Sequence, residues 1–349
     1  MQLPNDMDAL IVTNPYNILY LSGFKGISDT EREAILIVKN KQSILITAKL
    51  YREEASKLKT KVVYTNERDT LMLALQQTLK GAQKIGFEEK DLKVSEFNNF
   101  KTLLPGKDLI GTRDLIENLR AVKTSDEVKK IEKAQIISQN ALALLLKSLK
   151  TGQTEQEIAQ RLALIVQKVG GEGLSFESIV ASGPNSGIPH HKTGNRKIKT
   201  GDTLLFDFGA KYQNYCADVT RTVFVGKASD RQVNIYNHVM CAQQNAIEKV
   251  QRELKLKDAY NLAYEVFEDA QLHDYFIHGL GHGVGLEVHE SPYLRASSKD
   301  EDLLQDNMVF SVEPGLYFPW GGVRIEDLVV LQNGKAKVLG NIKKEIIVV

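Results

Sequence analysis

The first part of the chain alternates short apolar runs, rich in β-branched residues, with stretches of helical periodicity. The apolar runs cover residues 9–13, 34–38, 43–47, 62–65 and 84–87, and helical spacing covers residues 70–80 and 94–104. This alternation predicts an α/β domain over residues 1–123. Because that region contains no cluster of histidine, cysteine and carboxylate residues, we expect it to have a structural, capping or oligomeric role.

The pattern changes near Lys123, where amphipathic helices begin to alternate with strands. Three capping boxes, each a Ser or Thr followed three residues later by Glu or Gln, open predicted helices. They begin at Thr124, Thr154 and Ser229. Asp258 is expected to cap a fourth helix, which ends near residue 270.

Strand-like segments follow each pair of predicted helices. They cover residues 177–182, 202–209 and 220–226 after the first pair, and residues 307–315 and 323–331 after the second. Two successive helix–helix–strand units indicate that residues 124–349 form an internally duplicated domain with pseudo-two-fold symmetry. We expect each half to contribute one pair of carboxylates to a common site.

Two aspartates lie where the first half could form a hairpin. Asp207 ends an apolar strand, Gly209 begins a turn region and Asp218 follows on the next strand. A hairpin would bring both side chains to one rim. Taken singly, each aspartate also fits a purely structural interpretation, as a strand-end turn former or a solvated loop acid.

Two glutamates repeat this arrangement in the second half. Glu313 follows an apolar strand that Pro314 ends, and Glu326 lies inside the next apolar run. A carboxylate in an apolar strand is costly unless it is paired or bound. The structural alternative is a salt bridge from either glutamate to Arg324 on an exposed edge.

Histidines gather in the same region of the chain. Of the seven histidines, His190 and His191 are adjacent, and His278, His282 and His289 share a glycine-rich stretch. Alternating glycines from residue 279 to residue 285 disfavour a helix there. We therefore expect an exposed or cleft-lining loop instead of a helical zinc pair.

Four carboxylates aimed at one point repel each other in a low-dielectric interior, so they need cations to bind or protons to share. The resulting set is Asp207, Asp218, His282, Glu313 and Glu326. This oxygen-rich set suits two divalent ions, Mn²⁺ first, with Co²⁺, Zn²⁺ and Fe²⁺ as alternatives. Two such ions can share a bridging water and polarise a carbonyl, which predicts hydrolysis. The residues alone leave a carboxylate-bridged phosphoesterase open.

Composition narrows the partners and the location. Lys+Arg 45 against Asp+Glu 44 gives a formal net charge of +1, so there is no general attraction to nucleic acid or an anionic membrane. Cys216 and Cys241 are the two cysteines, which fits a reducing compartment. No apolar run has membrane-spanning length, and the first residues lack the basic start of a signal peptide. We expect a cytoplasmic protein.

The motifs, in their order and spacing, resemble the pita-bread metallopeptidases, in particular the Xaa-Pro dipeptidases (prolidases) and Xaa-Pro aminopeptidases. The resemblance runs through SGPNS, PHH, DFG, ADVTRT, HGLGHGVG, HESP, VEPG and GVRIED, and NPYNILYLSGF resembles the creatinase/prolidase N-terminal domain. It implies a mixed α/β N-terminal domain followed by a pita-bread catalytic domain. It also implies that a metal-bridging hydroxide hydrolyses the imide bond of short proline-containing peptides, and that the chain forms a homodimer.

The resemblance implies a role for each residue of the metal set. Asp207 would ligate one metal, Asp218 and Glu326 would bridge both, and His282 and Glu313 would complete the shell of the other. Glu313 would also carry the proton from the bridging water to the leaving nitrogen.

The remaining site residues are assigned in the same way. His190 and His289 match the histidines that orient the scissile carbonyl and stabilise the oxyanion. His278 matches a substrate-side histidine, and Arg324 matches an arginine that supports the ligands or binds a carboxylate. His191 matches no family role, and we expect it at the rim.

Substrate selection requires two further features. Proline has a fixed ring and no amide N–H, so it needs a shaped pocket, which we expect from His289, Tyr317 and Phe318. A dipeptidase also needs a cation for the proline carboxylate, for which Arg295 and Arg324 are candidates. An aminopeptidase leaves that side open.

Several relatives give alternative functions. Methionine aminopeptidases resemble the same catalytic domain but usually lack a domain like residues 1–123, and creatinase keeps the fold without the metal ligands. A catalytically silent peptide- or protein-binding relative would be marked by missing ligands or acidic tails. Since all five ligands are present, we expect an Xaa-Pro peptidase, with dipeptidase and aminopeptidase activity both open.

Overall fold

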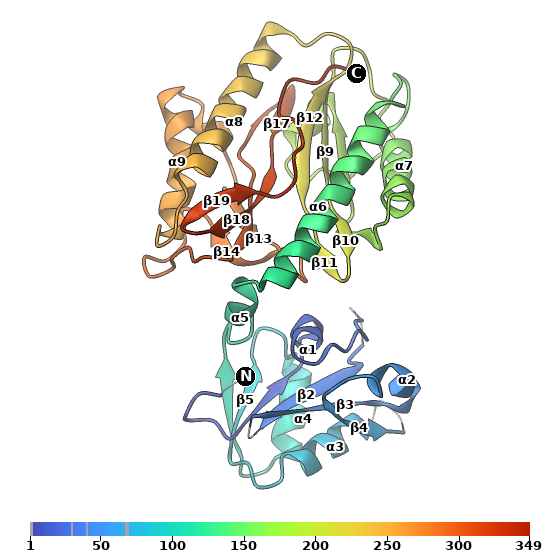
Figure 1. Cartoon of the computed structure of the whole chain (residues 1–349), viewed down its shortest axis with the longest axis vertical. Helices are drawn as coiled ribbons and strands as arrows, with labels where there is room; N and C mark the ends of the chain where they lie inside the picture. The colour runs from blue at the N-terminus through green and yellow to red at the C-terminus, as the bar shows by residue number, and fades with distance from the viewer. Residues whose placement is uncertain (1–2, 29–30, 40, 67–69) are drawn as a thin grey trace. The chain divides into compact units, whose positions relative to one another are not determined.

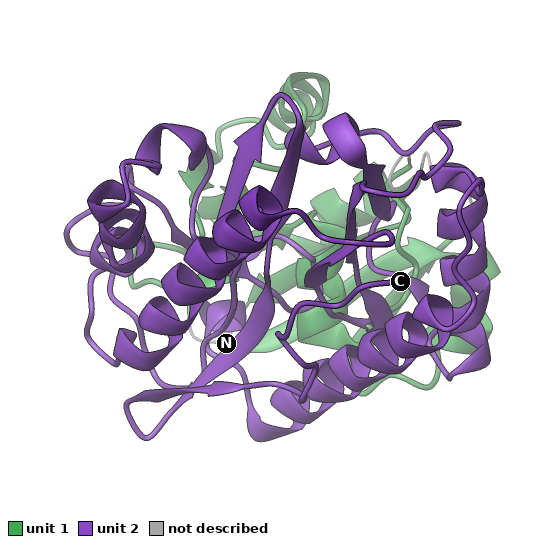
Figure 2. Cartoon of the chain, turned by 90° about the horizontal axis from the view of Figure 1, so that it is seen from above, with its two compact units in different colours: residues 1–118 green, residues 119–349 purple. Residues whose placement is uncertain are grey.

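The computed structural model describes residues 3–28, 31–39, 41–66 and 70–349. The chain divides into two units, Met1–Asn118 and Leu119–Val349, which Figure 2 colours separately. Helix α5 (Glu117–Ala121) spans the division. Among the helices within the described ranges, none combines the length and the apolar character needed to cross a bilayer.

A six-stranded mixed sheet forms the centre of the first unit, in the order β4-β3-β2-β1-β5-β6. Its strands are β1 (Ala9–Val12), β2 (Ala34–Lys39), β3 (Gln42–Ala48), β4 (Lys61–Thr65), β5 (Lys84–Glu88) and β6 (Asp108–Thr112). Its helices are α1 (Pro15–Ser22), the 3-10 turn η1 (Lys49–Tyr51), α2 (Arg52–Ala55), α3 (Leu71–Thr78) and α4 (Val94–Leu103). Pairing is antiparallel from β1 to β3 and parallel for β3–β4, β1–β5 and β5–β6.

Successive residues of a strand point to opposite faces of the sheet, so each face has its own apolar core. Ile35 and Ile37 of β2 pack in one cluster with Phe100 of α4. Leu36 of the same strand packs in the other cluster with Ile18 of α1. The expected α/β organisation of the N-terminal region is confirmed.

Two pairs of helices flank the strands of the second unit (Figure 1). They are α6 (Ser125–Leu146), α7 (Glu155–Lys168), α8 (Asp230–Lys249) and α9 (Leu256–Asp269). The first three begin at the predicted capping boxes, with Thr124, Thr154 and Ser229 as N-caps. This unit also contains the 3-10 turns η3 (Gly183–Gly187) and η4 (His273–Tyr275).

The prediction that Asp258 caps α9 was wrong. Asp258 lies in the first turn, and Lys255 occupies the N-cap position without a side-chain capping bond. The helix begins earlier because Lys255 forms a β-bridge with Leu303, and the Leu256 N–H donates to the Asp302 carbonyl at 3.0 Å.

The strands of the second unit form two main antiparallel sheets. The first contains β8 (Ile179–Ser182), β9 (Thr203–Phe208) and β12 (Val219–Phe224). The second contains β13 (Gly281–Gly283), β14 (Glu290–Leu294), β15 (Val309–Val312), β18 (Asp327–Gln332) and β19 (Lys335–Val338). Shorter strands are β7 (Gly173–Leu174), β10 (Ala210–Tyr212), β11 (Tyr215–Cys216), β16 (Gly315–Phe318) and β17 (Gly321–Arg324).

Each main sheet packs against its own helix pair. Residues of α6 and α7 share a core with β8, β9 and β12, and residues of α8 and α9 share a core with β15 and β18. This is the repeated helix–helix–strand order that the sequence predicted. The two halves therefore meet along their strands, where the carboxylates lie.

Residues near the end of the chain are bound to this junction. The Phe224 N–H donates to the Ile347 carbonyl at 2.9 Å, beside β12. Lys344 forms an ion pair with Asp327 at 2.7 Å, and Asp327 also pairs with Arg221 at 2.6 Å. Arg221 and Asp327 are each about 1% exposed, so this network is part of the core.

Candidate metal centre

The two aspartates lie on neighbouring strands of the first half. β9 and β12 are antiparallel, with Asp207 opposite Thr220, and Asp218 directly precedes β12. The short strands β10 and β11 lie between them in the chain. The hairpin expected from the sequence is therefore present, with an additional turn at its tip.

The two glutamates have the equivalent arrangement in the second half. β15 ends at Val312 and β18 begins at Asp327, and these two residues are paired. Glu313 and Glu326 lie one residue beyond that pair, on the same rim. The β16–β17 hairpin connects them.

His282 reaches the site from the short strand β13, between β14 and β15. A Cβ atom on Gly281 would lie 1.9 Å from the Ser311 carbonyl oxygen, and one on Gly283 would lie 2.1 Å from the Ser291 carbonyl oxygen. These glycines allow close approach of neighbouring backbones. The prediction of a loop at this point was therefore wrong for His282, although the absence of a helix is confirmed.

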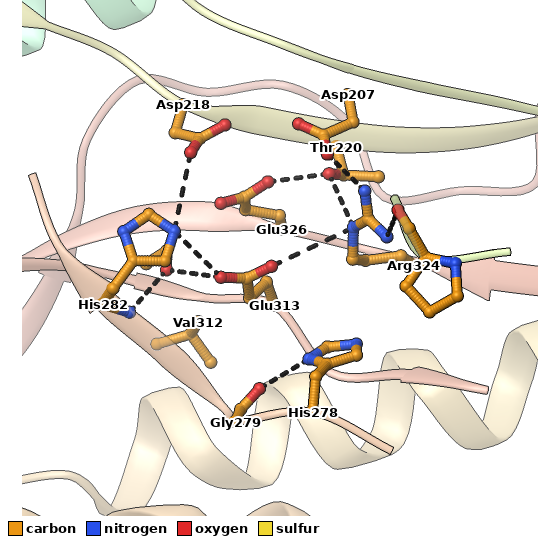
Figure 3. Close-up of polar contacts among 12 residues, drawn as sticks. Asp207, Asp218, Thr220, His278, Gly279, His282, Val312, Glu313, Arg324 and Glu326 are labelled. Carbon is orange, nitrogen blue, oxygen red and sulfur yellow. Dashed lines mark hydrogen bonds and ion pairs between the residues drawn. The ribbon is translucent and has the colours of Figure 1, made fainter. Parts of the chain in front are cut away.

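Five side chains from the two halves converge at this rim (Figure 3). His282 Nε2 lies 3.2 Å from Glu313 Oε1 and 3.7 Å from Asp218 Oδ2. Single ligand atoms of Asp218, His282 and Glu326 all lie within 4.8 Å of one another. Asp207 contacts Arg324, which is also 4.0 Å from Glu313. The predicted set of five is therefore brought together.

Burial and mutual repulsion act strongly on these carboxylates. Burial, with the charges of Glu313 and Asp207, raises the pKa of Asp218 and of Glu326 well above their ordinary values. Burial also raises the pKa of Asp207, although Arg324 opposes it. For Glu313, burial is outweighed by the hydrogen bond and charge of His282, and its pKa falls to about 2.

The oxygen and nitrogen atoms at this rim are suited to bind divalent metal ions. Asp218 Oδ1 and Glu326 Oε1 are buried, and neither has a hydrogen-bond partner in the described structure. His282 Nδ1 lies 3.2 Å from the Gly283 carbonyl oxygen, so Nδ1 carries the proton and Nε2 is free to bind a metal. A buried carboxylate oxygen that accepts no hydrogen bond raises the free energy of the folded protein unless a cation neutralises it. The residues present thus match a cation site rich in oxygen ligands.

A hydrogen-bonded chain runs beside the metal ligands. Arg324 donates to the Tyr317 hydroxyl at 2.8 Å, and that hydroxyl lies 2.8 Å from His278 Nε2. His278 Nδ1 lies 2.7 Å from the Gly279 carbonyl oxygen. Burial lowers the pKa of His278. Because Nδ1 faces a carbonyl oxygen, Nδ1 carries a proton, and Nε2 is placed to accept a hydrogen bond from the Tyr317 hydroxyl. Arg324, which is 3% exposed, lies in the interior and not on the exposed edge of the structural alternative.

A cavity of about 360 Å³ opens onto the carboxylates. Its polar wall includes the five metal-set residues and His190, His278, His289, Arg295 and Arg324. Its apolar wall consists of Phe176, Ile179, Pro189 and Tyr293.

The cavity differs from the proline pocket expected around Tyr317 and Phe318. Neither residue belongs to the described lining. Tyr317 is turned inward because its hydroxyl binds Arg324 and His278. Phe318 stacks with Trp320 at a centroid distance of 5.2 Å.

The predicted histidines occupy different positions. The His289 ring lies 4.2 Å from the His282 ring, and burial together with the charge of His282 lowers its pKa to about 4. His289 is therefore a neutral group in the cavity at pH 7. His190 also lines the cavity, whereas His191 contacts Glu155 at 2.9 Å and is not at the rim.

Sequence reasoning missed several residues of the site. Thr220 donates to Glu326 Oε2 at 2.7 Å, and Ser311 donates to Glu313 Oε1 at 3.0 Å. Ser311 lies two residues before Glu313, so the strand period could have indicated it. Phe176 and Ile179 carry no comparable signal, because apolar residues line many cores.

Comparison with known proteins agrees with this geometry. Residues 129–333 match metallopeptidase family M24, and residues 4–122 match the creatinase/prolidase N-terminal domain. The chain is 34% identical to an Xaa-Pro dipeptidase of Pyrococcus furiosus over 345 residues, which cover 98% of this chain and 96% of that protein.

Two solved structures are similar over nearly the full chain. An Xaa-Pro dipeptidase from Bacillus anthracis superposes with a TM-score of 0.93 at 33% identity, covering 98% of this chain and 95% of the other. An X-Pro aminopeptidase from Thermotoga maritima gives a TM-score of 0.90 at 33% identity, covering 98% of each chain.

Proposed function

Because this chain belongs to metallopeptidase family M24, we propose that it hydrolyses the bond between an amino acid and a following proline, using two divalent metal ions. The observation that supports this most directly is the convergence of four carboxylates and His282 on one cavity, with buried oxygens of Asp218 and Glu326 left without donors. Names of similar proteins include both Xaa-Pro dipeptidase and X-Pro aminopeptidase.

The protein side chains have separate tasks in this proposal. Asp218 and Glu326 would hold both ions, Asp207 would ligate one of them, and His282 with Glu313 would ligate the other. When bound, the ions, with Mn²⁺ proposed first, would supply a water of lowered pKa and a Lewis acid for the carbonyl. Ser311 and Thr220 orient two of the carboxylates by the hydrogen bonds described above.

Proton transfer and substrate orientation are assigned to groups that face the cavity. Glu313 lines the cavity beside His282, and it would accept a proton from water and pass it to the leaving nitrogen. His190 and His289 line the same cavity and would donate to the developing oxyanion. Phe176, Ile179 and Tyr293 would contact the proline ring in place of the pocket expected at Tyr317.

Arg295 favours a dipeptidase over an aminopeptidase. It lines the cavity, and its guanidinium lies over the Tyr293 ring, 4.5 Å from the centroid. Arg324 is already engaged by Asp207 and Tyr317. Arg295 is therefore the arginine of the described cavity wall whose charge is available to the carboxylate of a dipeptide.

Hydrolysis of Ala-Pro, Ala-Pro-Ala and a Met-initiated peptide with added Mn²⁺ tests the proposal. Cleavage of Ala-Pro alone supports the dipeptidase, and cleavage of Ala-Pro-Ala before proline supports the aminopeptidase. Cleavage of the Met-initiated peptide alone would select a methionine aminopeptidase. No cleavage of any peptide would select a silent binding relative. The homodimer and the cytoplasmic location stay predictions.

The variant Arg295→Met separates the two proline-directed activities. Losing a charged hydrogen bond to the proline carboxylate should raise KM for Ala-Pro by about tenfold or more. KM for the amide Ala-Pro-NH2, which has no carboxylate, should stay unchanged. Arg252→Met, at an exposed arginine outside the cavity lining, is the matched control. Equal effects on both substrates would contradict a carboxylate-binding role for Arg295.

A further inference from the structure

We propose that the contact between His191 and Glu155 fixes the turn that presents His190 to the cavity. His191 and Glu155 would then be positioning residues, acting through His190 and not on the substrate. The inference rests on the proposed function, because the task of His190 is assigned there. The sequence left His191 without a role, and the structure shows it bound to a buried carboxylate.

The adjacent histidines point to different surroundings. His190 is exposed and lines the cavity. His191 has 13% of its side chain exposed, and its Nε2 lies 2.9 Å from Glu155 Oε2. The His191 N–H donates to the Ile188 carbonyl at 3.1 Å, which closes a turn around His190. The orientation of one imidazole therefore constrains the backbone that carries the other.

Glu155 is a fixed anchor for this turn. It is fully buried in the first turn of α7. Its Oε1 accepts from the Ser182 N–H at 2.8 Å, the Ser182 hydroxyl at 2.6 Å and the Asn185 amide at 2.9 Å. A carboxylate held by several donors has little rotational freedom. Its position is thus set before His191 binds to it.

The same carboxylate holds both ends of the connecting segment. Ser182 ends β8, and the Gly194 N–H contacts Glu155 Oε2 at 3.3 Å. Residues 183–193 therefore leave and return to one anchor, and His191 is their contact nearest to His190. Fixing both ends and two interior points, Asn185 and His191, of a short loop removes most of its freedom.

The turn also touches the cavity wall. The Pro189 carbonyl lies 3.5 Å from Arg324 Nη1, and Arg324 contacts Asp207 of the metal set. A shift of the turn would move His190 relative to the carboxylates. Misplacement of a catalytic group by about 1 Å can lower a rate by about 100-fold.

Substitution of His191 should leave the protein folded, because Glu155 keeps its bonds to Ser182 and Asn185. We expect His191→Ala to lower kcat/KM for Ala-Pro by about tenfold or more. His191→Gln, which can still donate to Glu155, should recover most of the loss. His238→Ala, on α8 and outside the cavity lining, is the matched control and should behave as the wild type does.

A double-substitution cycle distinguishes positioning from general destabilisation. If His191 acts through His190, then adding His191→Ala to His190→Ala should have no further effect on kcat/KM. Additive losses would overturn the inference, as would a His191→Ala protein with wild-type kinetics. Failure of His191→Gln to recover activity would also count against it.

A second measurement does not depend on the proposed activity. Amide hydrogen exchange of residues 183–194 should be faster in His191→Ala than in wild type, while Mn²⁺ binding measured by calorimetry stays the same. If wild-type protein cleaves no Xaa-Pro peptide, the proposed function fails, and faster exchange in this segment still supports the anchoring of the turn. Unchanged exchange overturns it.

Discussion

The protonation state that the buried site favours for Asp218 and Glu326 differs between the metal-free and the metal-bound protein. Both are less than 5% exposed, and one oxygen of each has no hydrogen-bond partner among the described residues. In the metal-free protein their repulsion and burial favour protonation. Metal binding would reverse this preference, because a divalent charge would take the place of the protons.

Asp218→Asn tests this difference directly. The amide cannot bridge two ions as a carboxylate does, so kcat/KM for Ala-Pro should fall by more than about 100-fold. The thermal midpoint of the metal-free variant should be no lower than that of metal-free wild type, because the neutral amide replaces a carboxyl group whose raised pKa favours the neutral form. Steady-state kinetics and a thermal scan in chelator measure the two effects.

Asp269→Asn, at the exposed last residue of α9, is the control for Asp218→Asn. It should change neither kinetics nor the metal-free midpoint. Retention of full activity by Asp218→Asn would sink the two-metal assignment.

At the residue scale, the sequence predicted which side chains could bind a metal better than it predicted which residues would contact each other. The carboxylates and His282 could be found because their chemistry is unusual in apolar strands. The position of Tyr317 could not, since it depends on bonds to Arg324 and His278 that join distant segments. His191 was misplaced at the rim for the same reason, because its partner Glu155 is 36 residues away.

At the scale of secondary-structure elements, the ends of the strands position the carboxylates of the site. In the second half the paired strands end where the carboxylates begin, at Val312 and Asp327, and in the first half Asp207 is the residue before the last of β9, while Asp218 directly precedes β12. The first unit also places a carboxylate at a strand end. Glu88 ends β5 and accepts from the Thr13 N–H at 2.6 Å and from the Asn14 N–H at 2.7 Å, so it binds the segment between β1 and α1.

Glu88 gives the first unit a pH-dependent stability. Burial raises its pKa from 4.5 to about 7, against the opposing hydrogen bonds of Asn14, Asn17 and Thr13. A raised pKa means that the folded state binds the proton more tightly. Its contribution is therefore complete below pH 4.5 and is lost as the pH rises through about 7. The shift, 7 minus 4.5, corresponds to about 3 kcal/mol.

Glu88→Gln should remove this dependence, because the amide does not titrate. The decrease in the free energy of unfolding between pH 5 and pH 8 should be smaller in the variant than in wild type, by up to about 3 kcal/mol. Urea unfolding followed by circular dichroism measures it. Glu53→Gln, at a side chain that is 93% exposed, should keep the wild-type dependence. Identical pH profiles for Glu88→Gln and wild type would contradict the assignment.

At the element scale, the sequence predicted features that depend on neighbouring residues, and it did not predict features that depend on pairing with distant segments. The capping boxes at Thr124, Thr154 and Ser229 need only neighbouring residues, and all three are present. β13 was missed because its glycines suggested a loop, and their purpose becomes visible only beside β14 and β15. Asp258 was misassigned because pairing with a distant segment starts α9 early.

At the scale of the whole molecule, metal binding should stabilise the second unit. Trp320 is the single tryptophan of the chain and lies in that unit, so its fluorescence reports unfolding there. Mn²⁺ at 100 times its dissociation constant should add about 2.7 kcal/mol. The thermal midpoint followed by Trp320 should rise with Mn²⁺ and fall with chelator.

Asp218→Asn is the matched control for metal stabilisation. Its Trp320 midpoint should respond much less to Mn²⁺ than that of wild type. Equal responses in the two proteins would show that Mn²⁺ stabilises the unit from another place.

The residues bound beside β12 give the site a vulnerability far from its ligands in the sequence. Lys344 neutralises Asp327, the neighbour of Glu326, and Ile347 is bonded to Phe224. Proteolytic loss of residues 344–349 would leave Asp327 with one fewer cation and would remove the backbone bond beside β12. Cleavage at this segment would therefore weaken the site while every ligand side chain remained in the chain.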